Sequence, residues 1–503
     1  MEKVALIELG NSALRLILLN TKDGGYFDVV DELEEQIKVG KDIQTSSVLK
    51  PTTISECIGI LKMFRKLCDR RGVAKIVCVA TSLVREAKNQ NSFLDEVYNS
   101  CGFTMNLLTV EDEMRATYAG VVNTVDIPKG IIIEIANNTT NIIQYNRRTI
   151  LNQVCLPFGA TSLADEFENI DKISEKCEKV ESFVEKQLKK VEFLANLDPE
   201  IQFIGSGTMF KSIGYLSRKT SRYSLDIENN YILSADSFHA VNNFVKTLDV
   251  DKTKKLKGVS SERADVVLCG LAIAKTLFEY LHIENMSISA YGKKEGLIYN
   301  NIVPEINDKP LSDMMGFSIE NIRAFRDQEM TNASQVYALS IMLFKQLKVI
   351  HKLHRYYVKP LRIAASLYDS GKRIRFENSE KNSFEIILNS NINGVSQREI
   401  LIAAFASVCQ NLDNFNLSDW VKYKDIVTED DLDAVRKLGT IIKLAVALDK
   451  TKTSVVKDIS CDILGDSVIM KTVVEGDATF EISEGMKMGA DFKKVFKKYL
   501  EVI

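Results

Sequence analysis

The chain has 503 residues, and 45% of them are hydrophobic, which is enough for roughly three or four folded domains. Its 65 Lys and Arg residues nearly balance its 68 Asp and Glu residues, so no overall charge attracts nucleic acid or an anionic membrane. The N-terminus carries no basic leader, and no apolar run approaches the ~18 residues that span a bilayer. A cytoplasmic protein without a nucleic-acid or membrane partner is therefore expected.

Up to about residue 305, short apolar runs alternate with segments of helical period. Strands are predicted at residues 4–9, 16–19, 76–80, 131–135, 142–145 and 201–205. Residues 54–68 and 180–191 place their apolar side chains on one stripe, which predicts surface helices. The alternation predicts an α/β fold whose strands are buried on both faces. The nine cysteines lie singly, without a C-x-x-C pair, and are predicted to be buried free thiols.

One arrangement occurs twice in this part of the chain: a strand that ends in a carboxylate, a short polar turn, and a second strand. The copies are residues 7–16 and 133–142, and their carboxylates are Glu8 and Glu134. Backbone N–H groups of such turns bind phosphate oxygens, and a carboxylate before each turn can hold Mg²⁺. The alternative is a solvated glutamate at a strand end, the commoner situation for a charged residue.

Two turns that follow predicted strands are candidate phosphate-binding segments. Thr81 and Ser82 follow the strand at residues 76–80, at the end where open α/β sheets bind ligands. Arg85 can grip phosphate through its guanidinium, or it can pair with a glutamate on a solvated helix. Residues 205–208 (G-S-G-T) lie between a strand and a helix, so they can face an anion or form a purely structural turn.

An acidic cluster of Glu111, Asp112 and Glu113 begins a predicted helix after the strand-like residues 105–110. Negative charge at a helix N-terminus interacts favourably with the helix dipole. That effect alone explains the cluster from the residues themselves.

Helical periodicity dominates beyond residue 305. Helices are predicted at residues 332–347, 357–368, 397–410 and 432–448, after a linker that contains Pro304 and Pro310. Residues 454–503 are predicted to form a small α+β domain, with strand-like alternation at residues 467–474 and 479–482 before a basic, helix-like end.

In order along the chain, these segments resemble the exopolyphosphatase / guanosine pentaphosphate phosphohydrolase (Ppx/GppA) family. The family outline D-I-G-S-N-S-x-R-L, T-S-A-x-R-x-A-x-N, E-E-A-R-x-x-Y-x-G-V, D-I-G-G-G-S-T-E and G-x-G-T corresponds to residues 8–16, 81–89, 112–121, 134–141 and 205–208. The match continues at residues 156–160, 262–270 and 292–296 and through the helical part. The resemblance therefore covers essentially the whole chain.

The resemblance implies an actin/hexokinase-like duplicated α/β fold with two ribonuclease H-like lobes. Lobe I would span residues 1–125 and lobe II residues 126–305. An all-α HD-like domain would follow at residues 306–453, and the small α+β domain at residues 454–503. A homodimer is expected.

The implied site lies in the cleft between the lobes and binds inorganic polyphosphate or a guanosine polyphosphate, (p)ppGpp. Glu113 falls on the family's general base, which orients a water for attack on the terminal phosphorus. Arg15 and Arg85 would neutralise the phosphoryl oxygens, and Glu8 and Glu134 would hold Mg²⁺ or, in its place, Mn²⁺. The implied phosphate-binding residues are Gly10, Asn11, Ser12, Thr81, Ser82, Asn137, Asn138, Thr139, Gly205, Ser206, Gly207 and Thr208. The predicted activity is release of the terminal phosphate of polyphosphate, or of the 5′ phosphate of pppGpp.

The chain departs from the family outline at several positions, and the changes at residues 136–138 and 141 favour a second hypothesis. Glu8 and Glu134 replace aspartates, which adds about 1.5 Å of reach, the length of one C–C bond. The three glycines of the second turn read A-N-N at residues 136–138, which removes glycine's freedom at positive φ. Asn141 replaces a glutamate, and a carboxamide cannot act as a base. The alternative is therefore a weakly active or inactive regulatory protein that binds polyphosphate or (p)ppGpp.

The HD-like domain has lost the histidines that would bind a metal. Tyr368 and Asp369 stand at the His-Asp pair, residues 379–383 replace the histidine run, and Asn332 replaces the upstream histidine. A histidine-bound metal is not expected there. The domain is predicted to be a scaffold, a dimer surface or a groove wall for a polyanion. Basic residues between positions 352 and 375 favour the groove wall, although a solvated charged surface explains them as well.

Overall fold

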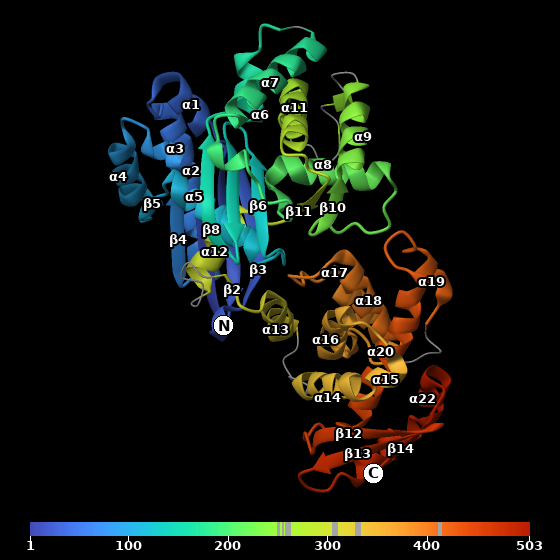
Figure 1. Ribbon diagram of the computed structural model, residues 1–503. Coiled ribbons are helices and arrows are strands. Elements are labelled where there is room, and N and C mark those ends of the chain that lie inside the picture. Colours follow the sequence, from blue (N-terminus) through green and yellow to red (C-terminus); the bar gives the residue numbers. More distant parts are fainter. Residues whose placement is uncertain are drawn as a thin grey trace. The chain divides into compact units, whose positions relative to one another are not determined.

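The structure is a computed structural model that describes residues 1–170, 172–248, 252–253, 256, 263–303, 310–326, 333–410 and 415–503. Within these residues the chain forms two compact units, which Figure 1 shows in the colours of the sequence. The first unit contains Met1–Ser221 with Glu228–Ser312, and the second contains Arg222–Ile227 with Asp313–Ile503. Glu262, Asn332 and the linker residue Pro304 lie outside the described residues.

Five strands form the first sheet of the larger unit, in the order β3-β2-β1-β4-β5. Their bounds are β1 (Glu2–Leu9), β2 (Ala13–Thr21), β3 (Phe27–Gln36), β4 (Lys75–Ala80) and β5 (Met105–Leu107). The pairs β1–β2 and β2–β3 are antiparallel, whereas β1–β4 and β4–β5 are parallel. The central strand β1 is buried from residue 4 to residue 9 and β4 from residue 78 to residue 80, as is typical of strands in parallel pairs.

Six strands form the second sheet, in the order β10-β11-β9-β6-β7-β8. Their bounds are β6 (Lys129–Ile135), β7 (Thr140–Asn146), β8 (Thr149–Leu156), β9 (Gln202–Ser206), β10 (Tyr231–Ser234) and β11 (Asn285–Ile288). Read from β8, the sheet repeats the first one pair for pair, with β6–β7 and β7–β8 antiparallel and β6–β9 and β9–β11 parallel. The duplicated actin-like fold predicted from the sequence is therefore confirmed, with β10 as an addition.

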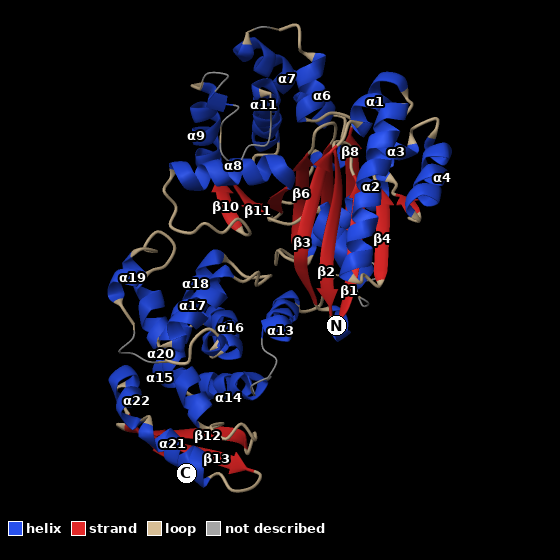
Figure 2. Ribbon diagram, turned by 180° about the vertical axis from the view of Figure 1, so that it is seen from behind, coloured by secondary structure: helices blue, strands red, loops and turns tan. Residues whose placement is uncertain are grey.

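Helices cover the faces of both sheets in this unit. They are α1 (Val39–Ser46), α2 (Pro51–Arg71), α3 (Ser82–Arg85), α4 (Gln90–Cys101), α5 (Val110–Val122), α6 (Ala160–Glu166), α7 (Ile173–Leu188), α8 (Gly207–Thr220), α9 (Ala235–Lys246), α11 (Ala264–Tyr280) and α12 (Lys293–Ile302). The predicted apolar stripe of α2 packs on one face of the first sheet, where Ile58, Leu61 and Phe64 join its core. Figure 2 shows α2 lying along this sheet.

Helices α5 and α12 cover the other face of the first sheet. Ala116 of α5 and Leu297 and Ile298 of α12 pack there. The opposite side of α5 packs on the second sheet through Met114, Tyr118 and Val121. Although residues 293–302 fall in the range predicted for lobe II, α12 returns to the sheet of lobe I. The predicted domain boundaries themselves stay predictions.

Glycines let α5 and α12 approach until their backbones touch. A Cβ atom at Gly296 would lie 1.7 Å from the carbonyl oxygen of Ala116, and one at Gly120 would lie 2.0 Å from that of Gly292. Neither backbone oxygen can rotate away, as the end of a side chain could. The register of the two helices is therefore fixed by these contacts.

The second unit is mainly helical, as predicted. Its helices are α13 (Met314–Arg326), α14 (Ala333–Gln346), α15 (Lys348–His351), α16 (Val358–Leu367), α17 (Ser379–Asn389), α18 (Gln397–Val408), α19 (Leu417–Val421), α20 (Glu429–Ala447), α21 (Thr479–Lys487) and α22 (Gly489–Phe496). At the former His-Asp motif, the Ser383 hydroxyl donates to Tyr368 O at 3.0 Å and accepts from Gly371 N–H at 2.9 Å. These bonds hold α17 against the turn after α16.

A three-stranded sheet follows, in the order β12 (Val456–Leu464), β13 (Ser467–Val474) and β14 (Tyr499–Val502). The strand-like interpretation of residues 479–482 is wrong, because they begin α21. Four residues are too few to separate period 2 from period 3.6, and here the buried side chain is Glu481, whose carboxylate accepts from Thr451 N–H at 3.1 Å. The basic end predicted as helical contains α22 and then β14.

All nine cysteines are free, and seven of them are buried. Among the helices in the described part of the chain, none combines the length and apolar character needed to cross a bilayer.

We expect Gly296→Ala to lower the free energy of unfolding of the larger unit by about 1–3 kcal/mol, the usual cost of overpacking. The added methyl group would collide with the Ala116 carbonyl oxygen. Chemical denaturation followed by circular dichroism measures the change. The matched control is Gly59→Ala in the middle of α2, where an added Cβ meets nothing within 4 Å. This substitution should stabilise the helix by ~0.5–1 kcal/mol. Equal effects at the two positions would contradict the close helix contact.

Candidate active site

The two predicted turns close in the same way in the two lobes. In the first turn, Gly10 N–H donates to Ala13 O at 2.8 Å, and in the second, Ala136 N–H donates to Thr139 O at 2.9 Å. Each turn follows a strand that carries the predicted carboxylate one residue before its end. The repeated hairpin read from the sequence is thus present in both sheets.

Each turn also touches the start of a helix. Asn11 O accepts from Gly40 N–H of α1 at 2.7 Å, and Asn137 O accepts from Thr161 N–H of α6 at 2.8 Å. Neither Asn137 nor Asn138 is among the residues with positive φ. The loss of the family's glycines therefore puts no strain on this turn, because its backbone does not use the left-handed region.

Glu8 and Arg15 lie on the face of the first sheet that α5 and α12 cover. They are directly opposite each other in the β1–β2 register, and the alternation of side chains puts Glu8 on the same face as Leu6. Arg15 Nη1 lies 3.7 Å from Glu8 Oε2, and Arg15 Nε donates to Glu34 Oε2 at 2.6 Å. Arg15 is thus held on the sheet between two carboxylates.

Lys293 joins two of the predicted glutamates. Its Nζ lies 2.8 Å from Glu8 Oε1 and 3.1 Å from Glu113 Oε2. The Glu8 side chain is 2% exposed and the Lys293 side chain 22%. The first residue of α12 therefore ties the end of β1 to the first turn of α5.

The charges of this group stabilise one another against burial. Burial raises the pKa of Glu8, but the positive charges of Lys293 and Arg15 outweigh it and bring that pKa below its ordinary value. Burial lowers the pKa of Lys293, but Glu8, Glu113 and, more weakly, Glu134 outweigh it and raise that pKa. Glu8 and Lys293 are both charged at neutral pH.

The carboxylate of Glu113 is oriented from two sides. Its Oε1 accepts from Ser82 N–H at 2.6 Å, while Oε2 accepts from Lys293. The neighbouring Thr81 hydroxyl donates to Asn11 Oδ1 at 2.9 Å, which links this segment to the first turn. Four predicted residues, Glu113, Ser82, Thr81 and Asn11, therefore meet in one place.

Glu134 reaches the same group from the second lobe. Its Oε2 accepts from Asn141 Nδ2 at 3.1 Å and from the hydroxyl of Thr117 at 3.4 Å. Thr117 lies one turn after Glu113 on α5, so both side chains project from one face of the helix. Gly207, at φ 81°, leaves room for Glu134, whose Cγ would lie 3.0 Å from an added Cβ.

Three predicted residues lie differently from the expectation. The guanidinium of Arg85 donates to the backbone carbonyls of Leu107 and Leu108, where β5 ends. Gly205 is buried, and Ser206 is fully buried and donates its hydroxyl to Tyr291 O at 3.0 Å. The G-S-G-T turn therefore offers a ligand only Gly207 and Thr208, at the start of α8.

Lys293, the residue that joins this group, was not predicted as a site residue. It stands next to Lys294, which is half-buried and bonds to Glu32. Nothing in the local pattern distinguishes the two lysines. The only signal was the resemblance of residues 292–296 to a family motif, which located the segment but not the function of the side chain.

The donors here do not fit the magnesium site predicted from Glu8 and Glu134. Mg²⁺ needs oxygen ligands at about 2.0–2.1 Å with further waters around it, but the Glu8 carboxylate is buried and already bonded to an ammonium group. Glu134 bonds instead to an amide and a hydroxyl. Nowhere in the described ranges do three or more His, Cys, Asp or Glu side chains gather so as to hold a metal ion.

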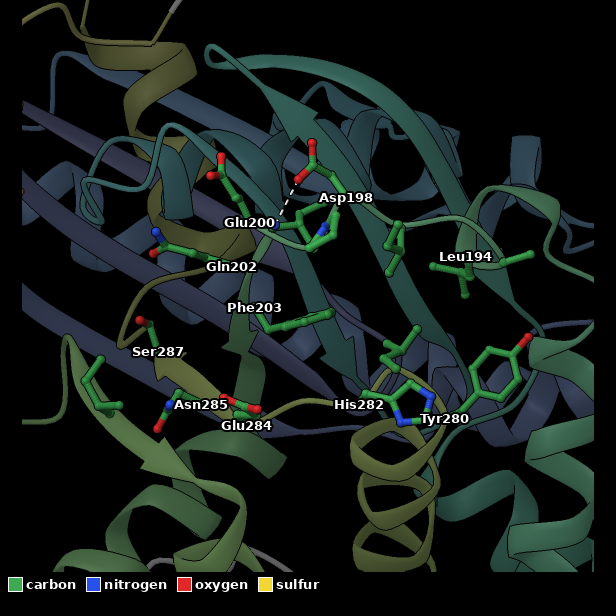
Figure 3. Close-up of a pocket in the computed structure, with 16 residues that line it drawn as sticks. Leu194, Asp198, Glu200, Gln202, Phe203, Tyr280, His282, Glu284, Asn285 and Ser287 are labelled. Atoms are coloured by element: carbon green, nitrogen blue, oxygen red, sulfur yellow. Dashed lines mark hydrogen bonds between the residues drawn. The ribbon is translucent and has the colours of Figure 1, made fainter.

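A separate cavity of about 930 Å³ lies where β9 and β11 begin, at the other end of β9 from Ser206. Figure 3 shows Asp198, Glu200 and Glu284 among the side chains that line it. It contains none of the predicted residues, and its three carboxylates repel a polyanion. The group around Lys293 is therefore the better candidate site for a phosphate chain.

Comparison with known proteins places most of the chain in one family. Residues 18–304 match the model of the Ppx/GppA phosphatase family, and residues 317–477 match the model of domain III of the Ppx/GppA phosphatases. The crystal structure of the Aquifex aeolicus member of that family shares the fold with a TM-score of 0.54 at 23% identity, covering 61% of this chain and 99% of that one.

Two curated relatives match different shares of this chain. A guanosine-5′-triphosphate,3′-diphosphate pyrophosphatase of Aeromonas hydrophila is 23% identical over 460 residues, which cover 89% of this chain and 88% of that protein. Exopolyphosphatase 1 of Mycobacterium tuberculosis is 21% identical over 314 residues, which cover 61% of this chain and 91% of that protein.

We expect Glu8→Gln to lower the free energy of unfolding at pH 7 by about 3 kcal/mol, because removing one partner leaves a buried charge less compensated. The effect must depend on pH. Since the pKa of Glu8 is lowered from 4.5 on folding, its contribution is present above about pH 4.5 and is lost as the pH falls through the lowered pKa. Denaturation curves of both proteins between pH 7 and pH 3 should therefore converge toward acid pH.

The control is Glu32→Gln, which breaks the surface pair with Lys294 and should change the free energy of unfolding by less than about 1 kcal/mol. If the free energies of unfolding of Glu8→Gln and the wild type differ by the same amount from pH 7 to pH 3, the stabilising charge does not belong to Glu8.

Proposed function

The chain belongs to the Ppx/GppA phosphatase family, and we propose that it is a phosphoanhydride hydrolase that releases the terminal phosphate of inorganic polyphosphate, or the 5′ phosphate of pppGpp. The observation that carries this proposal is that the ammonium of Lys293 joins Glu8 of β1 to Glu113 of α5, while the charge of Glu134 acts on it more weakly from the second lobe. Perturbed charges gathered beside two anion-binding turns are typical of a functional site.

In the proposed reaction, Glu113 acts as the general base. Both of its oxygens are already bonded, which fixes the carboxylate plane, but an ionised carboxylate has about four lone-pair positions and can accept a further hydrogen bond from water. The water oxygen attacks the terminal phosphorus as its proton passes to Glu113. The bond from phosphorus to the bridging oxygen breaks with its electron pair, which stays on the shortened chain.

The phosphate chain would be held by groups that surround this carboxylate. The backbone N–H groups of the two turns, at Gly10, Asn11 and Ser12 and at Asn137, Asn138 and Thr139, would bind phosphoryl oxygens. Gly207 and Thr208 add the N-terminus of α8, which favours an anion. Arg15 and Arg85 would supply positive charge, Arg15 from the sheet and Arg85 from the end of β5.

A second candidate function is binding of the same ligands without turnover. Asn141 bonds to Glu134 through its amide, so a neutral group stands where the family outline has another carboxylate. Lys293 also competes for the lone pairs of Glu113 that a base needs. A protein that senses polyphosphate or (p)ppGpp would keep the cleft and lose only the reaction.

We expect Glu113→Gln to reduce phosphate release from polyphosphate by about 10²–10⁴-fold, the usual contribution of a general base, because an amide cannot take the proton of the attacking water. Binding of polyphosphate should persist. Phosphate release and equilibrium binding, measured on the same preparations, separate the two effects.

The matched control is Glu111→Gln, two residues earlier in the same helical turn. The Glu111 carboxylate is exposed and bonds to Arg115. Its rate should equal that of the wild type. Binding of polyphosphate by the wild type without any phosphate release would reject the hydrolase and support the sensor. Equal loss of rate in both variants would show that Glu113 has no special role.

A further inference from the structure

Lys293 occupies a position that a lysine normally avoids. It is the first residue of α12, after Gly292 at the N-cap, where the positive end of the helix dipole repels a cation. The Lys293 side chain is also largely buried. A residue that breaks a local rule in this way marks a functional constraint more often than a packing one.

The geometry around the ammonium is that of a cation bridging two carboxylates. Glu8 Oε1 lies at 2.8 Å and Glu113 Oε2 at 3.1 Å, both within the range of charge-assisted hydrogen bonds. An ammonium group has three N–H bonds. Two of them serve these carboxylates, and no other residue in the described ranges accepts a hydrogen bond from Lys293.

The backbone of α12 holds the ammonium in this place. Gly292 N–H donates to Glu295 Oε2 at 2.9 Å, which closes the first turn of the helix. Gly296 lies against the carbonyl of Ala116 on α5, so α12 cannot slide along the helix that carries Glu113. The position of Lys293 is therefore set before any ligand binds, which lowers the cost of ordering it.

We propose that Lys293 is the built-in cation of this cleft: its ammonium bridges Glu113 and Glu8, one of the two residues predicted to hold Mg²⁺, and its third N–H binds a phosphoryl oxygen of the ligand. The bridging part needs only the residues of this chain, whereas the ligand part rests on the proposed function. A divalent ion that used Glu8 would have to displace the ammonium. The phosphate chain is therefore bound without a divalent ion at Glu8.

The test of the bridging part is a titration of the protein alone with Mn²⁺, followed by the electron paramagnetic resonance signal of the free ion. The wild type should show no site for Mn²⁺ in the cleft. Lys293→Met, which keeps an unbranched side chain one atom shorter and removes its charge, should gain one site because it frees Glu8 and Glu113. A further Glu8→Gln change in that variant should abolish the gain.

Two controls accompany the titration. Lys294→Met removes the neighbouring surface charge and should behave as the wild type. Lys293→Arg keeps a cation and should gain no site. A Mn²⁺ site in the wild type that Glu8→Gln removes would overturn the proposal, and this outcome does not require any Lys293 variant to fold.

The ligand part is tested by binding of polyphosphate in the presence of EDTA. The wild type should still bind, and Lys293→Met should bind about tenfold to a hundredfold more weakly, the range for losing a hydrogen bond from a charged group. Unchanged affinity in Lys293→Met would refute the phosphate contact. Phosphate release plays no part in either measurement, so a failure of the hydrolase proposal remains distinguishable from a failure of this one.

Discussion

The site depends on the backbone contact between α5 and α12. Gly296 against Ala116 and Gly120 against Gly292 bring the helices closer than any side chain would allow. Because Glu113 lies in the first turn of one helix and Lys293 begins the other, this contact sets the distance between the two charges. Burying either charge without the other costs several kcal/mol, so the packing of apolar helix faces and the pairing of charges specify the same arrangement.

The duplicated fold supplies two equivalent hairpins, but the two glutamates that precede their turns have different partners. Glu8 of β1 faces α12 and pairs with a lysine, whereas Glu134 of β6 faces α5 and bonds to Thr117 and Asn141. The difference follows from the helix that faces each glutamate, because α12 presents Lys293 to Glu8 whereas α5 presents Thr117 to Glu134. The symmetric frame therefore carries glutamates with different partners, a cation beside Glu8 and neutral groups beside Glu134.

The hairpins and Glu113 could be predicted from the sequence, but Lys293, the residue that pairs with Glu8 and Glu113, could not. The hairpins around Glu8 and Glu134 have strands that stand out as short apolar runs, and the family outline located Glu113. Lys293 lies 180 residues from Glu113 in the sequence, and only the folded chain distinguishes it from Lys294. The burial of Gly205 and Ser206 was equally hidden, because a turn of small residues reads alike whether it faces a ligand or the core.

The charge balance of the cleft connects Lys293 with another departure from the family outline. That outline places carboxylates at the positions of Glu8, Glu113, Glu134 and Asn141, and the resemblance implies a dication among them, which leaves two negative charges. Here the ammonium provides one positive charge less than a dication, and Asn141 removes one negative charge. The two changes compensate, so the cleft keeps the same excess of negative charge. Either change alone would shift the local potential by a full charge, which in a partly buried site is worth several kcal/mol. The presence of Asn141 beside Glu134 is therefore the composition expected of a cleft whose cation is a lysine side chain.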